Sequence, residues 1–277
     1  MMKWVNLLMH DMRCGLLRRR YLITVIIFLL PCLTSHSFFE TIGEKGTYAD
    51  YLLYCFKGSV PLVALAEEME FRLPVFWILA IGGCLLINLD YLLNDLTNSG
   101  HQIIIRCQNR DDWFISKCFW NISSCVLYFG LALLTILVYT LLQDGELTFT
   151  NTPEITVMLF YEALTDPVQL SVKDTIVCAI VSPLLTIIAY SLVEMLISLL
   201  IKPTIAFLTC IILLITSVYW DLPYLIGNGA MVIRSRYLID DGIDPTISIA
   251  VTLTVIIVSI LLGVYYFNRT DIIGVEA

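Results

Sequence analysis

The stretch TIVCAIVSPLLTIIAYSLVEMLISLLI, residues 175–201, is mostly apolar and carries a single charged side chain, Glu194. A bilayer core is about 30 Å thick, so a helix needs roughly 20 mostly apolar residues to cross it. Five further runs of similar character flank this one, and the sequence therefore predicts six membrane-spanning helices. The other five runs cover residues 21–39, 73–93, 118–142, 204–220 and 247–267.

The composition agrees with this interpretation. The chain has 277 residues, of which 58% are hydrophobic and 14% charged, and its mean hydropathy is +0.85. We therefore predict an all-α integral membrane protein with a single membrane domain over residues 1–277. Its parts are an interfacial helix (1–20), a six-helix bundle (21–267) and a cytoplasmic tail (268–277). The net charge of −8 offers no basic surface for nucleic acid.

The basic residues predict which ends of the helices face the cytoplasm. Lys and Arg concentrate in short cytoplasmic loops, whereas Asp and Glu contribute little to orientation. With the N-terminus inside, the inner segments hold ten of the 16 basic residues, and most acidic residues fall outside. We therefore expect both termini to be cytoplasmic. The ten inner residues are Lys3, Arg13, Arg18, Arg19, Arg20, Arg106, Arg110, Lys117, Lys202 and Arg269.

Residues 1–20 have the pattern of an amphipathic helix. Apolar side chains recur at helical spacing, and a basic cluster follows them. Such a helix can lie in the headgroup plane and contact membrane lipid. The alternative is a basic flank that only orients the first span. The apolar stripe consists of Trp4, Val5, Leu8, Met9, Met12 and Leu16.

The inner gap at residues 94–117 reads NDLTNSGHQIIIRCQNRDDWFISK. An apolar patch that includes Ile103 and Ile104 precedes Arg106 and Arg110, and Trp113 follows. Apolar and aromatic side chains on the aqueous side of a membrane indicate a surface for a partner. The alternative is that Trp113 begins the next span as part of an aromatic belt.

Two outer segments also carry structural signals. Residues 153–164 contain enough apolar side chains for a short helix on or in the membrane. Residues 223–236 read PYLIGNGAMVIRSR, in which Gly227 and Gly229 interrupt an apolar run. An irregular backbone at that depth is tolerated only where protein buries it. We expect a short broken helical cap between the fifth and sixth helices.

Glu194 has two interpretations. A carboxylate within a membrane span is costly, so it indicates a functional or a paired group. However, Glu194 lies eight residues before Lys202, about 12 Å along a helix from the inner interface. A position in the inner leaflet beside a polar neighbour is the alternative.

The sequence lacks the motifs of common enzymes. It contains no GxxxxGK[ST] phosphate loop, no HExxH and no serine nucleophile motif. The nine cysteines are scattered, with Cys55 alone in an outer segment, and they form no CxxC pair. We therefore expect no metal, no cofactor and no catalytic residue in this chain.

The whole arrangement resembles the permease subunits of type-2 ATP-binding-cassette exporters. GHQIIIRCQNRDDWFISK (residues 100–117) is similar to the pattern common after the second span of that family. YYFNRTDI (residues 265–272) is similar to the tail that often follows the last span. The long, acidic first outer segment, residues 40–72, departs from the short loop often found there.

The resemblance implies a multi-pass permease in a bacterial plasma membrane, which exports a peptide, lipid or drug-like substrate. A separate cytoplasmic ATPase subunit would bind ATP and Mg²⁺, and a second permease copy or a homologous permease would complete the pathway. The segment that contacts the ATPase would be residues 99–117. Its proposed contact residues are Ile103, Ile104, Arg106, Arg110 and Trp113.

Two other functions compete with this one. An ion-coupled secondary transporter would need broken helices and ionisable groups near the midplane, of which only Glu194 is evident. A non-transporting membrane sensor or immunity subunit could have the same topology. The sequence does not identify a substrate.

Overall fold

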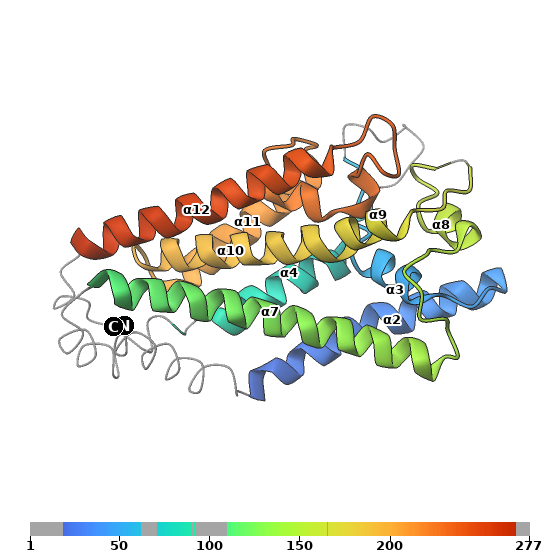
Figure 1. The fold of residues 1–277 in the computed structure, drawn as a ribbon, viewed down its shortest axis with the longest axis horizontal. Helices are drawn as coiled ribbons and strands as arrows, with labels where there is room; N and C mark the ends of the chain where they lie inside the picture. The colour runs from blue at the N-terminus through green and yellow to red at the C-terminus, as the bar shows by residue number, and fades with distance from the viewer. Residues whose placement is uncertain (1–18, 62–70, 90, 92–109, 165, 270–277) are drawn as a thin grey trace.

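The computed structural model describes residues 19–61, 71–89, 91, 110–164 and 166–269, and this part of the chain is helical without a β-strand (Figure 1). Residues 1–18 of the predicted interfacial helix, most of the inner gap and residues 270–277 of the predicted tail lie outside the described residues. In chain order the elements are η1 (Arg19–Tyr21), α2 (Leu22–Ile42), α3 (Tyr48–Cys55), α4 (Val75–Asn88), α7 (Arg110–Leu142), α8 (Pro153–Leu159), α9 (Val172–Ile176), η4 (Val177–Val181), α10 (Ser182–Ser198), α11 (Pro203–Tyr219), η5 (Ile226–Ala230), η6 (Val232–Arg234) and α12 (Pro245–Arg269).

Each of the six apolar runs forms a helix, and four of these are long and apolar enough to cross a membrane. The four stretches are Arg19–Ile42, Asp111–Leu142, Val172–Ser198 and Pro245–Arg269. The other two runs form shorter apolar helices, α4 and α11. The described residues therefore form an all-α fold with four candidate membrane-spanning helices.

Helix α10 lies at the centre of the bundle. It packs against α12, α11, α7 and α4, whereas α2 packs against α7, α4 and α3. In the stretch that contains α10, 61% of the most apolar 18-residue segment is buried inside the protein, whereas the corresponding share is 22% in the stretch that contains α12. Polar side chains on α10 are therefore in a position to contact several other helices.

The sequence predicted one regular helix over residues 175–201. The structure instead has a helix that a short π-helical turn interrupts. It begins at Val172, passes through the five-residue π-helical turn η4, and continues as α10 to Ser198. Pro183 lies at the start of α10 and has no backbone N–H to donate to the preceding turn. Short π-helical turns within α-helices occur frequently at functional sites.

The first outer segment is folded around Asp50. Thr47 and Asp50 form a capping box at the start of α3, and the carboxylate of Asp50 is fully buried. It accepts hydrogen bonds from the backbone N–H and the hydroxyl of Thr47, both at 2.9 Å. Thr152 donates in the same two ways, at 3.0 and 2.8 Å. Asp50 therefore joins α3 to the start of α8. Burial raises the pKa of Asp50, and these four hydrogen bonds oppose the rise.

We expect Asp50→Ala to lower the free energy of unfolding by about 3 kcal/mol, because buried donors would lose their acceptor. Glu154→Ala is the matched control, since Glu154 is exposed in α8 near the same contact. Denaturation of the detergent-purified chain, followed by tryptophan fluorescence, measures both variants. Equal stability of the two variants would contradict the role given to Asp50.

A cap closes the C-terminal end of α11, in agreement with the predicted break at residues 223–236. It consists of the short helices η5 and η6, and it is held by Arg234, which is 2% exposed. The guanidinium donates to the carbonyl oxygens of Ser217 at 2.6 Å, Val218 at 2.7 Å and Ser59 at 2.9 Å. It also donates to Oδ1 of Asn228 at 2.6 Å.

The position of Arg234 matches the chemistry of a helix end. The last carbonyl groups of an α-helix have no partner within the helix, and the helix dipole makes that end negative. At the end of α11, Arg234 donates hydrogen bonds to two of these carbonyl groups, and its positive charge compensates the negative end of the dipole. Burial lowers the pKa of Arg234 to about 10, so the guanidinium stays charged at neutral pH.

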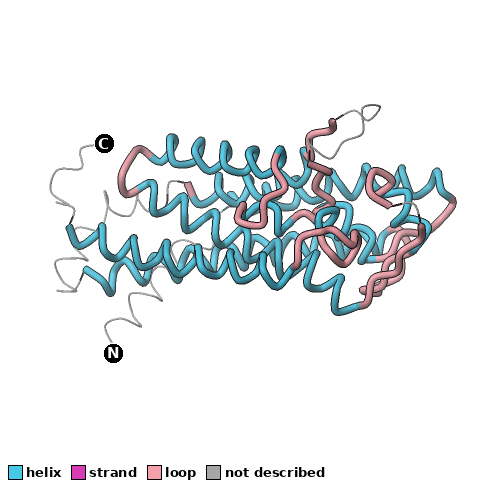
Figure 2. The backbone as a smooth tube through the Cα atoms, turned by 90° about the horizontal axis from the view of Figure 1, so that it is seen from above, coloured by secondary structure: helices cyan, strands magenta, loops and turns pink. Residues whose placement is uncertain are grey.

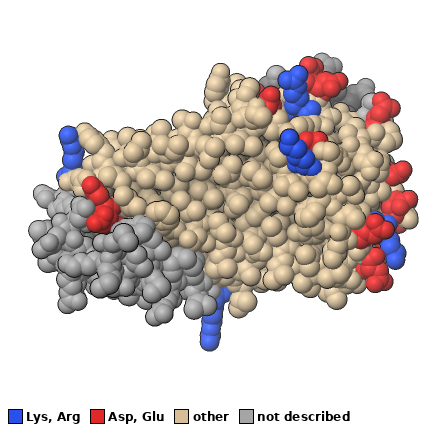
Figure 3. Space-filling view, viewed as in Figure 1, with Lys and Arg blue, Asp and Glu red and all other residues tan. Residues whose placement is uncertain are grey.

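Charged side chains gather at the ends of the bundle. Figure 3 shows Asp and Glu clustered on the end where α3 and α8 lie, and few charges along the middle of the visible face. Figure 2 shows that loops also concentrate at that end. Uncharged sides between charged ends are what a lipid-embedded bundle requires.

Candidate functional site

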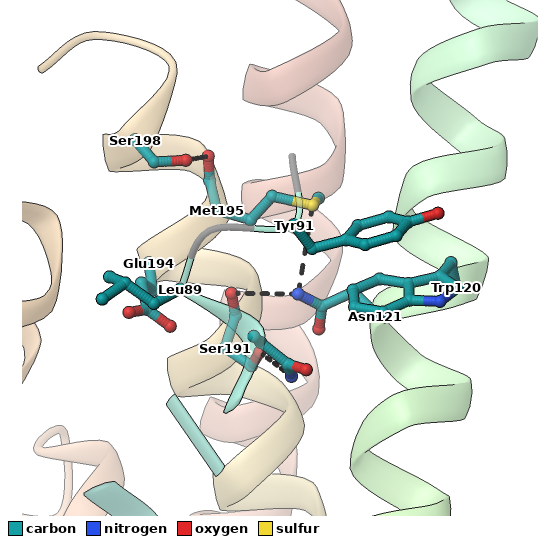
Figure 4. A pocket seen from close by; sticks show the side chains of 9 residues that line it. Leu89, Tyr91, Trp120, Asn121, Ser191, Glu194, Met195 and Ser198 are labelled. Atoms are coloured by element: carbon teal, nitrogen blue, oxygen red, sulfur yellow. Dashed lines mark hydrogen bonds between the residues drawn. The ribbon is translucent and has the colours of Figure 1, made fainter. Parts of the chain in front are cut away.

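Glu194 lies inside the bundle rather than on its lipid-facing surface. It is 3% exposed and lines a small cavity between α10, α7 and the end of α4 (Figure 4). The cavity measures about 10 Å³, close to the volume that one water molecule needs. The cavity is lined by Asn88, Leu89, Tyr91, Trp120, Asn121, Ser191, Glu194, Met195 and Ser198.

A chain of hydrogen bonds starts at this cavity and crosses four elements. The side-chain amide of Asn88 in α4 donates to Oγ of Ser191 in α10 at 3.0 Å. Oδ1 of Asn88 accepts from the hydroxyl of Ser124 in α7 at 2.5 Å. Ser124 in turn contacts the hydroxyl of Tyr21, in η1, at 2.7 Å. All four side chains are buried, so the network links the first, second, third and fourth runs.

Asn121 forms the opposite wall of the cavity. Its amide donates to the backbone oxygen of Ser191 at 3.4 Å and points toward Sδ of Met195 at 4.0 Å. Figure 4 shows these contacts on the far side of the cavity from the carboxylate of Glu194. A carboxylate, two amides and two hydroxyls thus surround a space of molecular-water size. Such a set can hold water or a small cation by oxygen contacts.

The structure gives no support for a transition-metal centre. Within the described residues, no group of three or more His, Cys, Asp or Glu side chains lies close enough to hold a metal ion. Cys84 and Cys125 lie 3.8 Å apart beside Asn88, and both are buried. Asn88 contacts both sulfurs and Asn121 contacts that of Cys125. Buried cysteine commonly packs as a small hydrophobic side chain.

Trp113 lies in the interior rather than on an exposed docking surface. It is the fourth residue of α7 and is fully buried. Its ring stacks on Phe267 of α12 with centroids 4.9 Å apart. Phe114 also stacks on Phe267, and it packs so closely on Gly263 that no side chain would fit there. Trp113 thus joins the N-terminal end of α7 to the C-terminal end of α12.

The remaining predicted contact residues are placed only in part. Ile103, Ile104 and Arg106 lie outside the described residues. Arg110 is the first residue of α7, and its side chain is not described. The contact surface assigned to these four residues therefore stays a prediction.

Lys117 is a buried cation that the sequence had identified only as a basic residue of the inner loop. It is fully buried, and its ammonium lies 5.1 Å from the ring centroid of Trp113 and 5.3 Å from that of Tyr91. The ring of Tyr91 stacks on Trp120, which lines the Glu194 cavity. The inner end of α7 and the cavity are thus contiguous through aromatic contacts.

Several residues of this site were missed in the sequence. Asn88 and Asn121 could have indicated the site from the sequence, because each is a polar amide within an apolar run. Polar residues within spans usually face the bundle interior and mark functional sites. Ser124 and Ser191 gave no comparable signal, since serine occurs throughout the apolar runs.

Comparison with known proteins gives one family. A family described as "Protein of unknown function (DUF2705)" matches residues 22–273. No curated protein matches the chain, and no solved structure matches it.

Proposed function

We infer the role of this chain, which belongs to the family of proteins of unknown function DUF2705, from its own architecture. We propose that it is the permease subunit of an ATP-binding-cassette exporter, driven by a separate cytoplasmic ATPase. The observation that carries the proposal is the combination of six apolar helices with a short broken cap, η5 and η6, between the last two. No nucleotide-binding motif occurs in the chain, so ATP and Mg²⁺ would bind to the partner.

The proposal counts α4 and α11 as spans in addition to the four long helices. Helix α11 has 17 residues, so it is about 26 Å long. Lys202 precedes it and Trp220 follows it, and both are exposed. A basic residue at the inner interface and an aromatic one at the outer interface are typical of a spanning helix. Helix α4 is shorter, but α2, α10, α11 and α7 cover it.

The orientation gives a first prediction for intact cells. Cys55 and Phe160 are buried, so exposed positions serve as reporters. We expect Glu44→Cys and Asp240→Cys to react with a membrane-impermeant maleimide from outside. Lys202→Cys should react above the level of the parent chain only after permeabilisation, because the proposed topology places it in the cytoplasm. Labelling of Lys202→Cys in intact cells would reverse the orientation.

The ATPase contact would be formed by residues 99–117, with Ile103, Ile104, Arg106 and Arg110 at the surface. The described part of the segment supports a narrower role for Trp113. Because its ring is buried on Phe267, it would hold α7 in place beside the contact rather than touch the ATPase. A second permease copy, or a homologous permease, would complete the pathway.

One observation favours the second candidate function, an ion-coupled transporter. The buried carboxylate of Glu194 lines the same cavity as Asn88 and Ser191, which belong to a polar network across four elements. Buried ionisable groups of this kind occur at ion sites of secondary transporters. In that case Glu194→Gln would abolish ion-driven transport, and the chain would work without an ATPase. The presence or absence of an ATPase partner therefore distinguishes the two functions.

The test of the proposed function is affinity purification in mild detergent, with identification of the co-purifying chains. We expect an ATPase with a phosphate-binding loop to co-purify with the parent chain and equally with Glu194→Gln. Absence of any such chain at stoichiometric yield would contradict the proposal and leave the ion-coupled alternative.

A further inference from the structure

Lys117 is a buried cation that contacts residues at the end of α4 and at the start of α7. Its ammonium lies between the rings of Trp113 and Tyr91, at 5.1 and 5.3 Å from their centroids. Tyr91 follows α4, and Trp113 is the fourth residue of α7. The two rings therefore belong to the chain on either side of residues 92–109, and Lys117 contacts both.

Each of these rings makes a second aromatic contact. Trp113 stacks on Phe267 near the end of α12, with only 15° between the ring planes. Tyr91 stacks on Trp120, which is one turn from Lys117 on α7 and lines the Glu194 cavity. A continuous series of contacts thus runs from the inner end of α12, through Lys117, to the wall of the cavity.

The physical chemistry makes this contact sensitive to movement. A buried ammonium is costly to desolvate, and an aromatic face compensates part of that cost, most strongly where water is excluded. Separating either ring from Lys117 would remove that compensation. The energy of the cation therefore depends on the relative positions of α4, α7 and α12.

We propose that Lys117 is a positioning residue that links the inner ends of α4 and α12 to the Glu194 cavity, so that displacement of either end opens or closes the cavity. This role rests on the proposed function, because the bound ATPase would supply the displacement. Lys117 itself touches neither ATP nor substrate in this proposal. It acts through Tyr91 and Trp113.

The test measures access to the cavity in the full-length chain. Ser198 lines the cavity and is 6% exposed, so Ser198→Cys reports its accessibility to a small methanethiosulfonate reagent. The rate is compared among Lys117→Met, Lys117→Arg and the parent, each carrying Ser198→Cys. Lys202→Met is the matched control, because Lys202 is exposed in the turn before α11. We expect the rate to change about fivefold or more in Lys117→Met, the lower range of allosteric coupling. Lys117→Arg should restore the parent rate, since guanidinium also binds aromatic faces.

A second measurement separates this proposal from the proposed function. In complexes that retain the ATPase, ATP turnover per complex should change about fivefold in Lys117→Met and stay at the parent value in Lys117→Arg. If no ATPase co-purifies with the parent, the proposed function fails, and the thiol rates alone decide the role of Lys117. Should Lys117→Met not fold, Trp113→Leu, which keeps the cation and removes the ring that does not line the cavity, should change the Ser198→Cys rate instead. Parent-like thiol rates in the folded variants would overturn the proposal, as would parent-like ATP turnover in a complex that holds the ATPase.

Discussion

Replacing Arg234 with Met is expected to lower the free energy of unfolding by about 3–5 kcal/mol, the largest effect on stability predicted for this chain. The change removes one buried cation that donates to carbonyl groups of Ser59, Ser217 and Val218 and to Asn228. Their buried oxygens would lose a charged donor, and the outer end of α11 would lose its cap. Denaturation of the purified chain in detergent measures the change.

Two matched variants define the cause. Arg236 is exposed and lies two residues away, so Arg236→Met should leave stability within about 0.5 kcal/mol of the parent. Arg234→Lys keeps the charge but not the planar fork of donors, and it should recover only part of the loss. If Arg234→Met were as stable as Arg236→Met, the cap would not depend on this side chain.

Truncating Ile104 to Ala is expected to weaken association with the ATPase by ten- to a hundredfold or more. The proposal places Ile104 at the centre of the contact, where loss of a buried apolar anchor costs roughly 1–3 kcal/mol. The stability of the chain itself should not change. Titration of the purified ATPase against the detergent-solubilised chain, with one partner labelled, measures the dissociation constant.

Leu208→Ala is the control for this prediction. Leu208 is 53% exposed on α11, where the proposed topology places it against lipid, so its truncation should leave ATPase affinity unchanged. Arg106→Ala should chiefly slow association and reduce its dependence on salt, as loss of a steering charge does. If the Ile104→Ala and Leu208→Ala variants bound the ATPase with equal affinity, residues 99–117 would not form the ATPase contact.

Much of the helical framework could be predicted from hydropathy. All six apolar runs form helices, because a long apolar run without charges can satisfy its backbone only within a helix. The break at Gly227 and Gly229 also indicated the cap. Hydropathy predicted one continuous helix over residues 175–201 and missed the π-helical turn, although Pro183, which has no backbone N–H to donate, was a local signal for a break there.

The site was less accessible to prediction. Glu194 was found because a carboxylate is rare in an apolar run, but its partners come from distant elements that only the fold brings together. The same holds for Asp50 and Thr152, which are 102 residues apart in the chain. Trp113 showed the limit of one-dimensional patterns, because an aromatic residue next to polar ones can face inward as well as outward.

The central claim is that a separate ATPase drives this chain, and ATP turnover of the affinity-purified chain in lipid vesicles tests it most directly. The account predicts steady ATP hydrolysis by the parent preparation. In the Ile104→Ala preparation, ATP hydrolysis should fall in proportion to the amount of ATPase that no longer co-purifies. Parent preparations that hydrolyse no ATP, or hydrolysis that Ile104→Ala leaves unchanged, would contradict it.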